Sequence, residues 1–171
     1  MAKDYLHIPA IGQKDPTLCW AASLSWWLKA AKSRNLSQET LRDRHFQMWN
    51  DDGTMSNQAM MDLIRDNRYG MKFHQFSNAT ALTSAKLQEH LNTGPVYIAF
   101  TEASSLKKHV NVIFGMRDMD GTAWVAAMEP QSAAQMDEFN LPSGEYNGKH
   151  EAKKLSEFNT IGTIYIGSLK N

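Results

Sequence analysis

The sequence contains a single cysteine, carries no net charge and lacks any long apolar run. With one cysteine, Cys19, an intramolecular disulfide is excluded, so the thiol serves either packing or chemistry. Lys and Arg total 18 and Asp and Glu total 18, so no overall positive field exists to hold a nucleic acid, and we expect none as a partner. The length of 171 residues, 42% of them hydrophobic, predicts one globular domain over residues 1–171.

No stretch approaches the roughly 20 apolar residues of a membrane span, and the first residues lack the apolar run of a signal peptide. These absences predict a soluble protein that starts in the cytoplasm. Its export would require a route that is independent of a signal peptide. The Cys and His spacing suits no zinc site and no phosphate-binding loop is present, so we expect neither a metal nor a cofactor.

What is present is a change of pattern along the chain. Apolar residues three and four positions apart predict a first helix from about 18 to 34 and further helices over 37–49, 56–67 and 84–92. After Gly94-Pro95, runs rich in β-branched and aromatic residues predict strands over 96–100, 109–114, 124–128 and 160–166. We therefore expect an α+β fold, with a helical half over about 15–92 packed on an antiparallel sheet over about 95–171.

Turn-forming residues predict the structure of two segments in the second half of the chain. Asp120-Gly121 lies between two predicted strands and indicates a tight hairpin turn, so these strands should be antiparallel neighbours. Residues 131–156 show no clear period and contain Pro142, Gly144 and Gly148, so we expect a long loop there, with one helical turn near 151–155.

Cys19 falls in the first turn of the first predicted helix, just after the breaker and cap residues Asp15, Pro16 and Thr17. Unpaired amides and the helix dipole favour negative charge there, which suits a nucleophilic thiolate. Such a thiolate needs an imidazole partner. The candidates are His7, His45, His74, His90, His109 and His150. We favour His109, which heads an apolar strand after a polar loop and should therefore lie at the rim of the sheet.

Two more residues would complete the chemistry of acyl transfer. Glu129 comes at the end of the neighbouring strand, where its carboxylate could orient the imidazole. The alternatives for that position are Gln131, Asp118 and Asp120. Gln13, six residues before Cys19, could donate its side-chain amide to a developing oxyanion together with the Cys19 backbone N–H.

These residues stand in motifs that resemble the papain-like cysteine proteases. Gln13–Ser23 resembles the family signature, in which a glutamine precedes Cys-Trp-Ala by six positions at the start of the central helix. Gly94-Pro95-Val96 and His109–Gly115 resemble the family's Gly-Pro strand and its histidine strand, in the same order. Glu129-Pro130 stands where small bacterial members have Asp-Pro. The resemblance is closest to those small bacterial enzymes, which include effector proteases delivered into host or rival cells.

The resemblance implies a papain-like fold, with the nucleophile at the start of the central helix. It also implies that Cys19 is the nucleophile, His109 the general base and acid, Glu129 the group that orients it, and Gln13 the oxyanion donor. The implied partner is a protein or peptide substrate in a host or rival cell, and an inhibitor or immunity protein would be a second partner.

The leading functional hypothesis is a hydrolase, possessing effector or toxin activity, that cleaves a peptide or isopeptide bond through an acyl-enzyme on Cys19. The same residues could serve a deamidase, a transglutaminase or an amidase of cell-wall peptides, because these share the acyl-enzyme and differ in the bond or the attacking group. A papain-like binding module without catalysis is the hypothesis from a different class.

Overall fold

The computed structural model describes residues 4–51, 54–77, 81–158 and 161–170. The helices are α1 (Cys19–Lys32), α2 (Gln38–Arg44), α3 (Asn57–Arg65) and α4 (Ser84–Leu91), with 3₁₀ turns η1 (Phe46–Met48) and η2 (Leu155–Glu157). The strands are β1 (Met71–Phe76), β2 (Val96–Thr101), β3 (Lys108–Met119), β4 (Thr122–Met136), β5 (Pro142–Lys154) and β6 (Ile161–Leu169).

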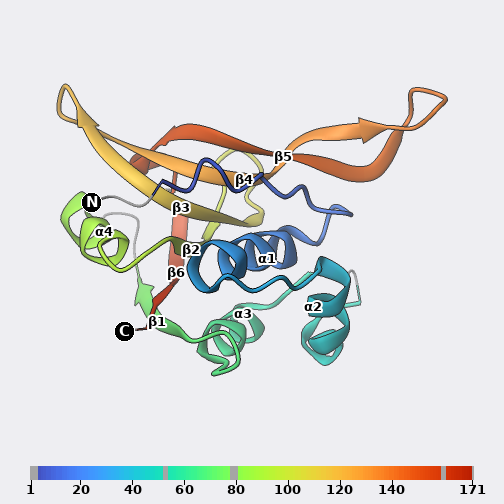
Figure 1. The fold of residues 1–171 in the computed structure, drawn as a ribbon, viewed down its shortest axis with the longest axis horizontal. Helices are drawn as coiled ribbons and strands as arrows, with labels where there is room; N and C mark the ends of the chain where they lie inside the picture. The colour runs from blue at the N-terminus through green and yellow to red at the C-terminus, as the bar shows by residue number, and fades with distance from the viewer. Residues whose placement is uncertain (1–3, 52–53, 78–80, 159–160, 171) are drawn as a thin grey trace.

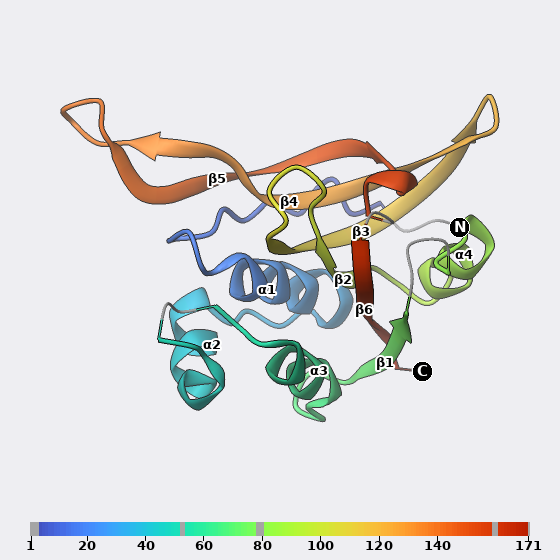
Figure 2. The ribbon, with the colours of Figure 1, turned by 180° about the vertical axis from the view of Figure 1, so that it is seen from behind.

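The strands form one antiparallel sheet in the order β1-β6-β2-β3-β4-β5. Side chains of α1, α2 and α3 share one apolar cluster with one face of the sheet. Side chains of α4 and η2 share a second cluster with the opposite face. Figures 1 and 2 show the first three helices below the sheet and α4 at its side. The expected α+β, papain-like arrangement is confirmed.

Helix α1 is the central element because it is apolar on nearly every side, as is typical of a buried helix. Two hydrogen bonds join α1 to β2 and to the residue just before it: Tyr97 Oη donates to Trp20 O at 3.2 Å, and Trp27 Nε1 donates to Pro95 O at 2.7 Å. Both bonds are buried, so they are strong constraints on the position of the helix. They hold the first turn of α1, and with it Cys19, against the sheet.

The predicted helices are present, with shorter ends. Ser37, Ser56 and Thr83 each accept a backbone N–H of the first turn of α2, α3 and α4, which is the chemistry of an N-cap. The pattern predicted over 37–49 divides into α2 and η1. Strand β1 lies inside the half predicted to be helical and was not expected, because its sequence MKFHQF contains no β-branched residue and so lacks the composition that marked the other strands.

The prediction of a long loop over 131–156 is wrong. Strand β4 continues to Met136 and pairs with β5, and the helical turn begins only at Leu155. This hairpin extends past the body of the molecule in Figure 1. Residues 131–136 of β4 are all exposed, and β5 alternates exposed and half-buried positions. The half-buried positions of β5 are mostly glycine or polar, so no alternation of apolar and polar residues marks these strands in the sequence, although the backbone ladder pairs them.

The Asp120-Gly121 prediction is confirmed, because the turn joins β3 and β4 as antiparallel neighbours. Both residues have positive φ, 54° and 77°, which matches the twist of a hairpin. The last predicted strand is β6, although Thr160, at its predicted start, lies outside the described residues.

Candidate active site

Cys19 is the first residue of α1 and is half-buried. Leu18 precedes it at the N-cap without a side-chain bond to the helix, and the first turn contains no acidic residue. The unpaired amides therefore keep their positive character at Cys19. Asp15 does not cap the helix as expected: its carboxylate accepts the backbone N–H and the hydroxyl of Thr17, at 2.8 and 2.5 Å, and so closes the preceding turn.

His109 lies at the start of β3, as predicted, and its side chain is only 4% exposed. Its Nε2 donates to Glu129 Oε1 at 2.5 Å, and the ring also hydrogen-bonds the Cys19 side chain. Since Nε2 is engaged by Glu129, Nδ1 is the ring nitrogen left for the thiol. The Phe100 ring packs edge-on against the imidazole, with the centroids 5.8 Å apart. The structure thus brings together Cys19, His109 and Glu129.

The electrostatics of the pair favour a charged imidazole. Burial alone would lower the pKa of His109, but the hydrogen bonds and negative charges of Cys19 and Glu129 raise it to about 10. Burial alone would raise the pKa of Glu129, but His109 and Lys153 lower it to about 2. These contacts therefore favour a protonated His109 ring paired with an ionised Glu129 carboxylate.

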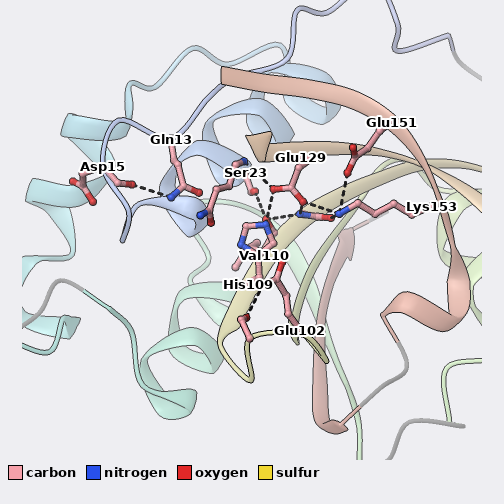
Figure 3. A network of polar contacts seen from close by, with 12 residues as sticks. Gln13, Asp15, Ser23, Glu102, His109, Val110, Glu129, Glu151 and Lys153 are labelled. Carbon is pink, nitrogen blue, oxygen red and sulfur yellow. Dashed lines mark hydrogen bonds and ion pairs between the residues drawn. The ribbon is translucent and has the colours of Figure 1, made fainter. Parts of the chain in front are cut away.

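Both oxygens of Glu129 are fully used. Oε1 accepts His109 Nε2 and, at 2.8 Å, the backbone N–H of Gln131. Oε2 accepts Asn111 Nδ2 at 3.0 Å and Lys153 Nζ at 2.7 Å. Four donors leave this carboxylate one orientation, which is the one that bonds His109. Figure 3 shows the chain of contacts from His109 through Glu129 to Lys153.

The alternatives to Glu129 lie elsewhere or contribute differently. Gln131 reaches Glu129 through its backbone only. Asp118 lies near the end of β3 and Asp120 lies in the β3–β4 turn, where the Asp118 carboxylate accepts the backbone N–H of Gly121. Glu129 is therefore the residue, among those weighed, whose side chain bonds the imidazole.

The other histidines are placed in different surroundings. His45 Nε2 lies 2.5 Å from the Tyr69 hydroxyl, and His74 and His90 lie with their ring centroids 4.3 Å apart. His150 packs on Trp26. In the described part of the chain no cluster of three or more His, Cys, Asp or Glu could hold a metal ion.

Gln13 is fully buried. Its Nε2 donates to Asp15 O at 2.9 Å, and its Oε1 has no hydrogen-bond partner among the described residues. An orphaned buried oxygen costs free energy and is a feature found at functional sites. Nε2 carries two hydrogens, so the bond to Asp15 O leaves a second hydrogen for another acceptor. In Figure 3 the Gln13 amide and Lys153 lie on opposite sides of His109 and Glu129.

The loop that carries Gln13 is held from two sides by backbone hydrogen bonds. Gln13 N donates to Pro130 O of β4 at 2.9 Å, and Gln13 O accepts Tyr146 N of β5 at 2.8 Å. On the other side the Gln38 amide donates to Gly12 O at 2.7 Å and accepts Lys14 N at 3.1 Å. These bonds satisfy successive backbone groups of the loop and fix its path.

Close backbone contact between this loop and the hairpin requires glycine. A Cβ at Gly12 would lie 1.8 Å from Tyr146 O, and one at Gly148 would lie 2.4 Å from Ile11 C. A cavity of about 390 Å³ lies beside this contact and is lined by both segments, including Gln13, Lys14 and Tyr146. The hairpin thus borders the site, where an irregular segment was expected.

Sequence reasoning missed Asn111, Lys153 and Gln38. Asn111 sits two residues after His109 and therefore on the same face of β3, a signal that was available. Lys153 lies in the segment wrongly predicted as a loop, and Gln38 looks like an ordinary first-turn residue of a helix. Nothing local in the sequence distinguishes these two from surface residues.

A buried helix that begins at a cysteine and packs on an antiparallel sheet carrying a histidine is the architecture of a papain-like cysteine protease. Residues 3–143 match the family described as papain-like cysteine protease AvrRpt2, and the chain belongs to this family. It is a cysteine peptidase by family, and the AvrRpt2 family is one of bacterial effectors. A search of curated proteins found no match. Among the described residues, no helix has the length and apolar character needed to cross a membrane.

Proposed function

We propose that this protein hydrolyses a peptide or isopeptide bond in a protein substrate through an acyl-enzyme, with Cys19 as nucleophile. The observation that carries the proposal is the placement of His109 between the Cys19 thiol and the Glu129 carboxylate. Family membership supports a protein as the substrate.

In the first half-reaction the Cys19 thiolate attacks the scissile carbonyl carbon, and the carbonyl electron pair moves to oxygen. The Cys19 backbone N–H and the free hydrogen of Gln13 Nε2 are the proposed donors to this oxyanion. As the intermediate collapses, the C–N bond breaks and the imidazolium of His109 gives its Nδ1 proton to the leaving amine.

In the second half-reaction His109, now neutral, takes a proton from water, and the resulting hydroxide attacks the thioester carbon. Collapse of that intermediate breaks the C–S bond, releases the carboxylic acid product and restores the ion pair. Glu129 keeps the ring in the tautomer with Nε2–H throughout, because its Oε1 accepts that proton's hydrogen bond.

The direct test is the loss of activity and labelling in Cys19→Ala. Wild-type protein should react with iodoacetamide at about pH 6, where an ordinary thiol is almost entirely protonated, and His109→Ala should lose this reactivity. A wild-type protein that reacts only as an ordinary thiol does, with no dependence on His109, would refute the proposed site.

The bond is identified by mass spectrometry after incubation with a protein library and, separately, with peptidoglycan. New peptide termini in the library, absent with Cys19→Ala, support proteolysis. Converted glutamine side chains, cross-links or released cell-wall peptides without new protein termini would instead support the deamidase, transglutaminase or amidase reaction.

We further propose that the substrate lies outside the cell that makes the protein, as the effector character of the family supports. Fractionation of the producing bacterium, in contact with a host or rival cell, tests this. Protein found only in the producer's cytoplasm under those conditions would contradict it.

A further inference from the structure

Lys153 is a half-buried cation that is linked to His109 through the Glu129 carboxylate. It lies next to the end of β5, and its side chain is 15% exposed. Its Nζ donates to Glu129 Oε2 at 2.7 Å, to Asn111 Oδ1 at 3.0 Å, and lies 3.1 Å from Glu151 Oε1. An ammonium has three hydrogens, and each finds an acceptor here. Figure 3 shows Lys153 on the side of Glu129 away from Gln13.

A buried ammonium costs free energy unless it is paired and hydrogen-bonded. Burial alone would lower the pKa of Lys153, but Glu129 and Glu151 raise it, so the charge persists. A nearby lysine has no such environment: Lys149 is exposed and is aligned with Glu129 in the β4–β5 ladder. Strand β5 therefore carries one lysine whose charge lies beside the site, Lys153, and one whose charge lies at the surface, Lys149.

We propose that Lys153 is a positioning residue of the active site: with Asn111 it holds the Glu129 carboxylate in the orientation that bonds His109, and its charge offsets that of Glu129. The inference rests on the proposed roles of Cys19, His109 and Glu129. Lys153 reaches the reacting atoms only through Glu129, and it does not touch the thiol or the substrate.

The physical reason lies in the two oxygens of Glu129. Oε1 serves His109 and Oε2 serves Lys153 and Asn111, so the carboxylate is held at both ends. Without the ammonium, Oε2 would keep a single neutral donor, and the carboxylate could turn away from the imidazole. Partners of this kind, one step behind the reacting groups, typically contribute 10-fold to 100-fold.

The charge has a second effect, on the proton of His109. The titratable groups in contact with this network are Cys19 of α1, His109 of β3, Glu129 of β4, and Glu151 and Lys153 of β5. Removal of the Lys153 charge leaves the negative charge of Glu129 less compensated. The imidazolium is then held more strongly, and its titration moves to higher pH by roughly one unit.

The experiment compares Lys153→Met with wild-type protein and with Lys149→Met as the matched control. Methionine keeps an unbranched apolar stem and removes the ammonium, which lies 5.8 Å from the centroid of the Phe158 ring. Histidine ring signals in NMR give the pH at which His109 titrates, and this needs no substrate. We expect a shift to higher pH in Lys153→Met and none in Lys149→Met, whose charge is solvated.

The second readout is kcat/KM on the peptide that the library experiment identifies. We expect a fall of about 10-fold or more for Lys153→Met, with the basic limb of the pH profile displaced upward. Lys153→Arg keeps the charge and should return the limb to the wild-type pH. If Lys153→Met fails to fold, Lys153→Gln supplies the uncharged side chain for both measurements.

An unshifted His109 titration in the folded, uncharged variant overturns the proposal, even where activity falls, since that loss would be merely structural. Failure of the proposed function is a different result. It would appear as a wild-type protein without His109-dependent reactivity of Cys19, whereas failure of the present inference leaves that reactivity intact.

Discussion

The two sides of the proposed site are held in different ways. On one side, the buried Glu129 and the half-buried Lys153 hold each other through charge. On the other side, the loop of Gln13 is held by backbone hydrogen bonds to β4, β5 and the Gln38 amide. The first kind of support is sensitive to protonation and the second is not. Changes at Glu129 and Lys153, the acid side, should therefore alter the pH dependence of activity. Changes at Gln13 and Gln38, the oxyanion side, should alter turnover equally at every pH.

The largest effect should come from the acid side. Glu129→Ala removes the carboxylate that orients His109 and leaves Lys153 without its nearest partner, so we expect a loss of about 10³-fold or more in kcat/KM. Steady-state kinetics on the identified peptide measure it. Glu89→Gln, on the exposed surface of α4, is the control. Retention of activity within a few-fold would exclude Glu129 from the proposed mechanism.

Next comes the oxyanion side. Gln13→Ala removes the proposed side-chain donor, and we expect kcat to fall by about 10²-fold to 10³-fold with an unchanged pH profile. Gln88→Ala on exposed α4 controls for the loss of an amide elsewhere. A displaced limb of the pH profile would show that Gln13 is electrostatically coupled to His109 and Glu129, and would contradict the independence of the two sides.

Folding stability should depend on pH through the acid side. The pKa of Glu129 is about 2 against 4.5 ordinarily, so its contribution exists above about pH 4.5 and is lost as the pH falls through about 2. The pKa of His109 is about 10 against 6.5, so its contribution exists below about pH 6.5 and is lost as the pH rises through about 10. Both contributions to stability are therefore fully present between about pH 4.5 and about pH 6.5.

The two shifts share one interaction, so they are counted once, at about 3 kcal/mol. Urea unfolding should therefore show greater stability at about pH 5.5 than at about pH 3 or about pH 9. In Glu129→Gln the loss of stability between about pH 5.5 and about pH 3 should be smaller than in wild-type protein. Equal stability of wild-type protein at all three pH values would contradict the pairing of His109 and Glu129.

The smallest effect concerns the support of the oxyanion loop. Gln38→Ala removes two hydrogen bonds to the backbone of Gly12 and Lys14, and leaves the bonds from β4 and β5 in place. We expect a fall of about 10-fold in kcat, without displacement of the pH profile. Single-turnover kinetics with the identified peptide separate this effect from product release. A loss as large as that of Gln13→Ala would mean that the remaining hydrogen bonds from β4 and β5 are not enough to hold the loop in place.

Local chemistry explains which predictions from the sequence succeed. The helix starting at Cys19 is marked by the turn of residues 15–17 and by a dense apolar pattern, and the β3–β4 hairpin is marked by Asp120-Gly121. Both signals lie within a few residues, which is the range over which sequence patterns act. The β4–β5 hairpin fails this test because residues 131–136 of β4 are exposed and the half-buried positions of β5 are mostly glycine or polar.

The sequence by itself determined that Cys19 begins a buried helix, that His109 begins a strand and that Gln13 precedes Cys19 by six residues, since each depends on local spacing. Only the tertiary structure decided which carboxylate meets His109, because Asp118, Asp120 and Glu129 all belong to the same hairpin in the sequence. It also brought Lys153 to Glu129 and Gln38 to the loop of Gln13. The single cysteine therefore acquires its partners from β3 and β4 through long-range packing, which no local pattern encodes.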